Sequence, residues 1–326
     1  DITQIIKDEK KGVLFKKGHI VREEDIPALL SVGKEHLYVW EKQEGILHEN
    51  EAAEILYRIS ADIHMHGSDI KEGKIELIAD CDGVLKIRRD ALLAVNSLGE
   101  MMIASRHGDF PIKKGDKVAG TRIIPLVIEK EKMDAAEKAA GNLPIFDILP
   151  YQQKKVGIVT TGSEIKKGLI QDTFTPVLRE KLSGFPTEVT GQVMPGDDKE
   201  EITKAILSFA DAGADLIFCT GGMSVDPDDR TPGGIRDTGA KIVTYGAPVL
   251  PGAMLLVAYL ERNGRSIPVL GLPGCVMYAK RTVFDLILPR VMADDEIKAE
   301  EIARLGEGGL CLNCPVCTFP NCGFGK

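Results

Sequence analysis

The sequence predicts an α/β domain with a mostly parallel sheet over residues 151–297, preceded by a smaller β-rich α+β region over residues 1–150. Two observations predict this organisation. Short apolar runs alternate with amphipathic helical stretches from residue 154 to 292, which is typical of an α/β domain with a mostly parallel sheet. The first 150 residues instead contain short apolar segments between Gly and Asp turns. Residues 298–326 hold four of the seven cysteines and are treated as a third part, a cysteine-rich tail.

Composition limits the function classes. A chain of 326 residues has the length of two domains, each large enough to bury its own core. The formal net charge of −8 argues against a protein that binds nucleic acid by neutralising phosphates. No apolar run approaches the roughly 18 to 20 residues of a membrane span, and no signal-peptide pattern is visible. An odd number of cysteines with one tight cluster fits a reducing compartment, so we expect a cytoplasmic protein.

The N-terminal region is predicted from its turns. Strands are expected at residues 16–20, 72–80, 82–87 and 114–120, and helices at 23–32 and 49–59. Tyr38 and Trp40 are expected to pack inside this region. A polar helical stretch at residues 129–140, followed by Pro144 and Pro150, marks the expected domain boundary.

The α/β domain is predicted from its periodicity. Apolar residues recur at helical spacing over residues 201–212 and lead into a buried strand at 215–219. Further strands are expected at 156–160, 242–245 and 267–270, and further helices at 175–182 and 277–291. Asn263-Gly264 predicts a β-hairpin, because this pair favours the tight turn that joins two antiparallel strands.

Glycine-bearing loops follow three of these strands, at residues 160–164, 220–224 and 271–274. The carboxyl ends of parallel strands meet at one edge of a sheet, where ligands of such domains bind. Backbone N–H groups in the loops and at the starts of the next helices favour an anion such as phosphate.

Carboxylates lie beside these donors: Glu164 in the first loop, and Asp226, Asp228 and Asp229 in the second. Acidic groups beside a phosphate are unfavourable unless a cation such as Mg²⁺ bridges them. The alternative is that the three aspartates only cap a helix that starts near Thr231-Pro232.

Six motifs in the same order resemble the molybdopterin-binding domain shared by molybdopterin molybdenumtransferase, molybdopterin adenylyltransferase and gephyrin. They are TTGSE (160–164), GLIQD (168–172), PGDD (195–198), TGGMSV (220–225) with Asp229, PG (251–252) and GLPG (271–274). The resemblance covers about residues 154–292 and implies a three-layer α/β fold that binds the pterin dithiolene and its phosphate. Residues 251–254 read Pro-Gly-Ala-Met where the transferase family has Pro-Gly-Lys-Pro, so a cationic contact to an oxyanion is missing.

This resemblance implies the site residues. Glu164 and Asp229 fall at the acidic catalytic positions, and Asp228 joins Asp229 as a candidate metal ligand. The candidate cofactor-binding residues are Thr161, Gly162, Ser163, Gly221, Gly222, Ser224, Pro251, Gly252, Leu272, Pro273 and Gly274.

A second resemblance concerns the same domain. Residues 162–165, 170–173 and 227–231 look like the N-terminal domain of the competence/damage-inducible protein A family. That family implies metal-dependent cleavage of ADP-ribose-type pyrophosphates, so the two resemblances share the fold and differ in substrate.

The tail has the spacing C-x2-C-x2-C-x4-C, formed by Cys311, Cys314, Cys317 and Cys322. Four thiolates at this spacing bind one tetrahedral zinc or an iron–sulfur cluster, and the alternative is a tail with free thiols. The surrounding glycines predict a flexible appendage that a metal would have to order. His64 and His66 are interpreted as surface histidines.

The resulting hypothesis is a molybdopterin-binding protein of molybdenum cofactor biosynthesis, similar to a molybdopterin molybdenumtransferase. It would hold molybdopterin or its adenylylated form with Mg²⁺, for molybdate insertion or phosphoanhydride chemistry. The alternatives are an Mg²⁺-dependent nucleotide pyrophosphatase and a non-enzymatic cofactor carrier or redox sensor. Expected partners are a pterin phosphate and a molybdoenzyme, with no nucleic acid or membrane, and the family resemblance implies a homo-oligomer.

Overall fold

The computed structural model describes residues 2–6, 10–16, 19–37 and 43–326. The chain divides into two compact units, residues 1–46 and 47–326. In the first unit β1 (Ile2–Ile6) pairs antiparallel with β2 (Lys10–Phe15). The strand predicted at 16–20 is absent from the described part of that range. Tyr38 and Trp40 lie outside the described residues.

The helix predicted at residues 23–32 is shorter and split. A 3-10 helix, Glu23–Asp25, precedes α1, Ile26–Ser31. Pro27 lies at the first turn of α1, where its missing N–H costs nothing, so the α-helix starts there. β3 (Ile46–His48) crosses the boundary between the two units.

The first part of the second unit is an α+β structure, as the sequence predicts. Seven of its strands form two antiparallel sheets, β4-β5-β9-β7 and β11-β6-β8, and β10 pairs with β3. The elements are α2 (Glu49–Ser60), β4 (Met65–Gly67), β5 (Ile75–Ala79), β6 (Gly83–Ile87), α3 (Arg89–Asn96), β7 (Met101–Ser105), β8 (Phe110–Ile112), β9 (Lys117–Ile123), β10 (Val127–Glu129), α4 (Lys130–Ala140) and β11 (Phe146–Pro150).

The polar stretch at 129–140 belongs to this part of the structure. It forms α4, whose Met133, Ala136 and Ala140 are buried in the same core as Leu56 of α2 and Phe146 of β11. The helix is therefore amphipathic and packs its apolar side against this core, although most of its residues are charged.

The second part holds a six-stranded sheet in the order β13-β12-β14-β17-β16-β15. The first three pairings along this order are parallel and the last two antiparallel. The elements are β12 (Lys154–Thr160), α5 (Ser163–Lys166), α6 (Phe174–Leu182), β13 (Thr187–Val193), α7 (Lys199–Asp211), β14 (Leu216–Thr220), α8 (Thr231–Asp237), β15 (Lys241–Tyr245), β16 (Leu256–Arg262), β17 (Arg265–Leu272), a 3-10 helix (Gly274–Met277), α9 (Val283–Met292) and α10 (Ala299–Arg304).

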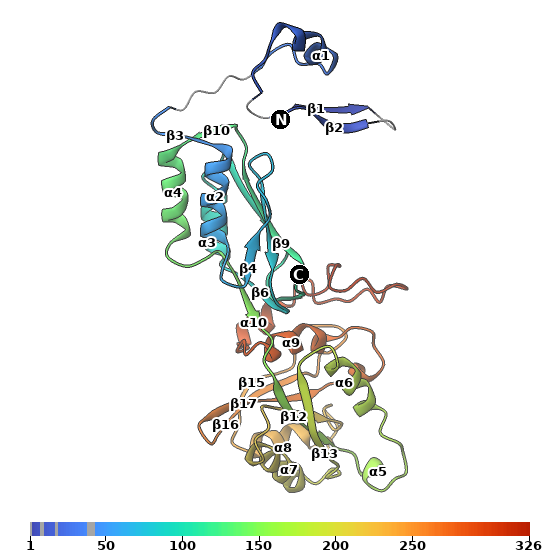
Figure 1. Ribbon diagram of the computed structural model, residues 1–326. Coiled ribbons are helices and arrows are strands. Elements are labelled where there is room, and N and C mark those ends of the chain that lie inside the picture. The colour runs from blue at the N-terminus through green and yellow to red at the C-terminus, as the bar shows by residue number, and fades with distance from the viewer. Residues whose placement is uncertain (1, 7–9, 17–18, 38–42) are drawn as a thin grey trace. The chain divides into compact units, whose positions relative to one another are not determined.

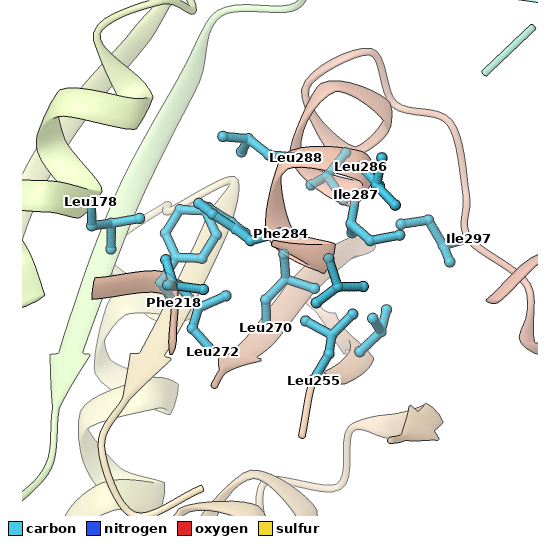
Figure 2. Close-up of a cluster of buried hydrophobic side chains, with 14 of the residues drawn as sticks. Leu178, Phe218, Leu255, Leu270, Leu272, Phe284, Leu286, Ile287, Leu288 and Ile297 are labelled. Carbon is cyan, nitrogen blue, oxygen red and sulfur yellow. The ribbon is translucent and has the colours of Figure 1, made fainter. Parts of the chain in front are cut away.

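Both faces of this sheet are buried. Alternate residues of β14 pack into different cores, one on each face. Leu216 and Phe218 pack in one core with Leu178 of α6 and Phe284 of α9, while Ile217 packs in another core with α7 and α8. Figure 2 shows the first core, where the rings of Phe218 and Phe284 meet edge to face at 5.4 Å. Helices on both faces of the sheet (Figure 1) make the three-layer α/β fold that the sequence resemblance implies.

Two local predictions can be compared directly. The hairpin is confirmed: Asn263 and Gly264 both have positive φ and join β16 to β17. The helix predicted from residue 277 starts later, at Val283, because Thr282 caps it: the hydroxyl accepts a hydrogen bond from Phe284 N and Asp285 completes a capping box.

The tail is packed, not a free appendage. Leu250 N donates to Gly309 O, and Cys311 N donates to Leu250 O. Phe324 is 4% exposed and belongs to the core around Phe284. The sequence prediction missed this because one buried aromatic anchors a segment that is otherwise polar and glycine-rich. Within the described ranges, no helix has the length and apolar character needed to cross a membrane.

Candidate functional site

Three parallel strands end side by side. Thr160 at the end of β12 is in register with Thr220 at the end of β14, and Thr220 is in register with Leu272 at the end of β17. The three glycine-bearing loops therefore leave one edge of the sheet from adjacent positions, as the sequence analysis predicts.

The first two loops are held together by threonines. Thr161 N donates to Thr220 O at 2.7 Å, the hydroxyls of Thr161 and Thr231 lie 3.0 Å apart, and the Thr231 hydroxyl donates to Gly221 O at 2.9 Å. Gly221 has φ +84°, and a Cβ there would lie 2.5 Å from Thr161 O. The close approach of the two loops therefore requires glycine at this position.

The second loop is ordered by its own aspartates. Asp229 Oδ2 accepts from Ser224 N at 2.8 Å, and Asp229 N donates to Asp226 O at 2.9 Å. The alternative that these aspartates cap the next helix is wrong, because the N-cap residue of α8 is Arg230 and no side chain caps it. Asp228 is exposed and Asp229 half-buried, so both carboxylates remain near the loop surface.

Tyr245, from β15, contacts the same loop and was not predicted. Its hydroxyl donates to Met223 O at 2.9 Å. Burial, together with the negative charge of Asp229, raises the pKa of Tyr245. The tyrosine therefore stays a neutral donor that fixes the second loop from the side.

The first loop begins α5, and a neighbouring loop supports it. Ser163 N donates to Asp197 Oδ2 at 2.7 Å, and Lys166 Nζ donates to Pro195 O at 2.9 Å. Glu164 lies on α5 with an exposed side chain. Asp197 was not predicted as a site residue, although the motif at 195–198 that contains it was recognised.

A polar network behind the first loop was also missed. Asp172 accepts from the N–H groups of Phe174 and Thr175 and, at 2.6 Å, from the side-chain amide of Gln192. Gln192 Nε2 also lies 2.9 Å from the hydroxyl of Thr160. Burial alone would raise the pKa of Asp172, but these hydrogen bonds outweigh it and lower the pKa, so the carboxylate is ionised. The sequence signal that could have predicted this network is an aspartate two residues before an apolar helix, a position at which a carboxylate accepts hydrogen bonds from the helix start.

Most of the remaining predicted cofactor-binding residues pack against other parts of the domain. Leu272 and Pro273 are buried, and a Cβ on Gly252 would lie 2.4 Å from Val283 Cγ1 of α9. Pro251 O accepts from Val283 N at 3.0 Å. Gly274 differs from them: it is exposed and has open space where a Cβ would be, so a ligand can reach its backbone. Ligand binding by Pro251, Gly252, Leu272 and Pro273 stays a prediction.

A possible metal-ligand group lies elsewhere, in the α+β part. Asp62, His64 and Asp147 offer ligand atoms within 4.8 Å of one another. Partial burial of its carboxyl and the neighbouring Asp62 raise the pKa of Asp147 to about 6. His66 is exposed and pairs with Asp80 at 2.7 Å, as expected of a surface histidine, whereas His64 is not a simple surface residue.

The four tail cysteines are among the residues that line one cavity of about 250 Å³. Lys280 and Arg281, from the segment between β17 and α9, also line it, together with Phe319 and Phe324. All four cysteines are free and line this cavity, whereas metal binding by them stays a prediction.

The fold and the site define a class: a three-layer α/β domain with three glycine-bearing loops at one sheet edge. Residues 157–293 match the family described as "Probable molybdopterin binding domain". Residues 1–41 match a domain of unknown function.

Similar proteins carry three kinds of name. A molybdopterin molybdenumtransferase from Haemophilus influenzae is 27% identical over 236 residues, 70% of this chain and 54% of the relative. A molybdopterin adenylyltransferase from Pyrococcus furiosus is 27% identical, covering 39% of this chain and 80% of the relative. A CinA-like protein from Mycolicibacterium gilvum is 35% identical, covering 24% of this chain and 18% of the relative.

Among solved structures, the molybdopterin biosynthesis enzyme MoaB from Thermus thermophilus is 27% identical, with a TM-score of 0.35, covering 42% of this chain and 91% of that one. The chain spans about half the length of the transferase, the first relative above. The family model and two of these relatives carry molybdopterin in their names, which supports a molybdopterin-related role for this domain.

Proposed function

We propose that this protein binds molybdopterin, or its adenylylated form, through the three loops at the sheet edge, as part of molybdenum cofactor biosynthesis. The observation that carries the proposal is the register of Thr160, Thr220 and Leu272, which starts the three loops from adjacent strand ends. A phosphate there would meet backbone N–H groups of the loops around Gly162, Gly221 and Gly274.

Mg²⁺ prefers carboxylate oxygens and substrate phosphate as ligands, and one or two carboxylates suffice when a phosphate completes the site. Glu164, Asp228 and Asp229 do not bring three ligand atoms within 4.8 Å of one another, so Asp228 and Asp229 of the second loop or Glu164 of α5 would hold the ion only together with a bound phosphate. The ion would supply positive charge between these acids and the phosphate. Asp229 has a second role, because its hydrogen bond from Ser224 N shapes the loop that would hold the phosphate.

The chemistry of this arrangement is binding and orientation. Tyr245 and the threonines Thr161 and Thr231 hold the second loop against the first, so the donors are preorganised before the ligand arrives. Transfer of a group, either molybdate insertion or phosphoanhydride cleavage, would require Glu164 and Asp229 to lie beside the bound phosphate. A homo-oligomer and a molybdoenzyme partner are part of the same proposal.

The test is retention of pterin. Wild-type protein incubated with cofactor-containing extract and Mg²⁺ is expected to retain a molybdopterin-derived pterin, detected by fluorescence after oxidation and release. Asp229→Ala is expected to retain less than about one tenth as much, a loss of at least about 1.4 kcal/mol. Circular dichroism would verify that the variant is folded.

Asp237→Ala is the matched control. Asp237 ends α8, the helix that follows the second loop, and pairs with Lys199 at 2.7 Å, so its removal changes the net charge equally but leaves the loop intact. Absence of pterin on the wild-type protein, or equal retention by wild type and Asp229→Ala, would refute the proposal.

A nucleotide pyrophosphatase is the second candidate, supported by the similarity to the CinA-like protein. This activity would release a nucleoside monophosphate from ADP-ribose in the presence of Mg²⁺, Mn²⁺ or Co²⁺. Turnover without pterin retention would favour it over the first proposal.

A further inference from the structure

The cysteine loop is held at its base by the rest of the domain. Gly325 N donates to Gly308 O at 2.9 Å, just outside the first and last cysteines. Cys311 and Cys322 are partly buried against the core that contains Phe324. Cys314 and Cys317, between them, are exposed. Because both ends of the loop are fixed, the four cysteines line one cavity without needing a metal to fold the segment.

The spacing of the sulfur atoms distinguishes two kinds of metal site. Four sulfurs at about 2.3 Å from one tetrahedral zinc lie roughly 3.8 Å apart. In the described part of the chain, the only group of three or more such ligands with all atoms within 4.8 Å is Asp62, His64 and Asp147. No three cysteine sulfurs of the tail converge to that distance. Sulfurs that ligate different irons of a cluster lie further apart, because the cluster itself lies between them.

The size and charge of the cavity agree with this. It has a volume of about 250 Å³, more than a single ion would need. A [4Fe–4S]²⁺ core with four thiolates carries a net negative charge, and Lys280 and Arg281 line the same cavity. Lys280 Nζ donates to Pro315 O at 2.9 Å, which holds this cation over the middle of the loop.

Arg281 adds an independent observation. Its guanidinium donates to Asp285 Oδ1 at 2.8 Å and lies 5.0 Å from the centre of the Phe319 ring. Its Nε is buried and has no hydrogen-bond partner among the described residues. A buried N–H without an acceptor is costly, and a sulfur acceptor beside it would remove this cost. N–H donors to sulfur are also a means by which proteins adjust iron–sulfur clusters.

We propose that Cys311, Cys314, Cys317 and Cys322 bind a [4Fe–4S] cluster, with Arg281 and Lys280 compensating its charge. This proposal does not depend on the proposed function.

The test is anaerobic reconstitution of the full chain with ferrous iron and sulfide. We expect iron and acid-labile sulfide at about four of each per chain, with the broad visible absorption of a cluster that bleaches on reduction. Cys317→Ser is expected to lose most of this absorption. Cys81→Ser, which changes a cysteine of the α+β part, is expected to keep all of it. Near-native circular dichroism of both variants would show that the fold is intact.

Three outcomes would overturn the proposal. The first is one tightly bound zinc per chain that iron and sulfide do not replace. The second is two irons per chain, because this indicates a smaller cluster. The third is equal cluster content in folded Cys317→Ser and wild type. If Cys317→Ser does not fold, Cys314→Ser, at the exposed part of the same loop, provides the same comparison.

Discussion

At the scale of single residues, the candidate site depends on polar groups with several partners each. Asp172 shows this best, because its carboxylate accepts from two backbone N–H groups at the start of α6 and from Gln192. Gln192 in turn contacts Thr160 at the end of β12. One carboxylate therefore connects a helix start to the strand end from which the first loop leaves.

The lowered pKa of Asp172 predicts a pH dependence. A carboxyl with a lower pKa in the folded state stabilises the protein above its unfolded pKa, and this contribution is lost as pH falls through the folded pKa. Asp172→Asn should lower the free energy of unfolding at pH 7 by about 1–2 kcal/mol. The difference from wild type should shrink below about pH 4.

Urea unfolding at pH 7, 5 and 3.5 measures this difference. Asp237→Asn, a change at an exposed pair on α8, should give a difference of less than about 1 kcal/mol at every pH. If the free energy of unfolding of Asp172→Asn stays below that of wild type by the same amount from pH 7 to pH 3.5, ionisation of Asp172 does not stabilise the fold.

At the scale of elements, close packing of α7 on the sheet depends on a small residue. A Cβ on Gly157 of β12 would lie 2.5 Å from Cγ of Phe209 in α7. Gly157→Ala should therefore force the helix away from β12 and cost about 1–3 kcal/mol. Because β12 also carries the first loop, the change should weaken ligand retention as well.

Thermal unfolding measures the packing cost. Gly120→Ala, in β9 of the α+β part, is the control, since no atom lies within 4 Å of its added Cβ. A melting temperature of Gly157→Ala equal to that of Gly120→Ala would contradict the packing account.

The elements also show what sequence reasoning can reach. Continuous apolar runs and the helical periodicity of 201–212 predict the strands and helices of the α/β domain, because burial on both sides leaves a clear pattern. The three loops were predicted to converge for the same reason: parallel strands have their carboxyl ends together. Contacts between distant segments, such as those of Tyr245 and Gln192 with the loops, leave no such periodic signal.

The tail illustrates the same limit. The cysteine spacing predicts a shared site, and the structure shows that the four cysteines line one cavity, while the site itself stays a prediction. The packing of Phe324 and the contribution of Lys280 and Arg281 depend on tertiary structure. The candidate metal-ligand group of Asp62, His64 and Asp147 was missed because Asp147 lies far from the other two in sequence.

At the scale of the whole molecule, ion pairs connect the α+β part to the α/β part within residues 47–326. Lys86 of β6 pairs with Asp295 at 2.8 Å, and Asp295 also accepts from Arg290 of α9, whose side chain is 7% exposed. Phe110 of β8 packs in the core of the α/β domain. Changes at this junction should therefore affect both parts, whereas ligand binding at the sheet edge should affect only the loops.

The central claim is that the three loops at the edge of the parallel sheet bind molybdopterin. Amide NMR resonances during titration of the folded chain with molybdopterin and Mg²⁺ test it most directly. We predict that the resonances of Gly162, Gly221, Gly222 and Gly274 shift together with one dissociation constant, while that of Gly120 in the α+β part does not. Saturating ligand that leaves the loop glycines unchanged, or that shifts residues elsewhere instead, would contradict the claim.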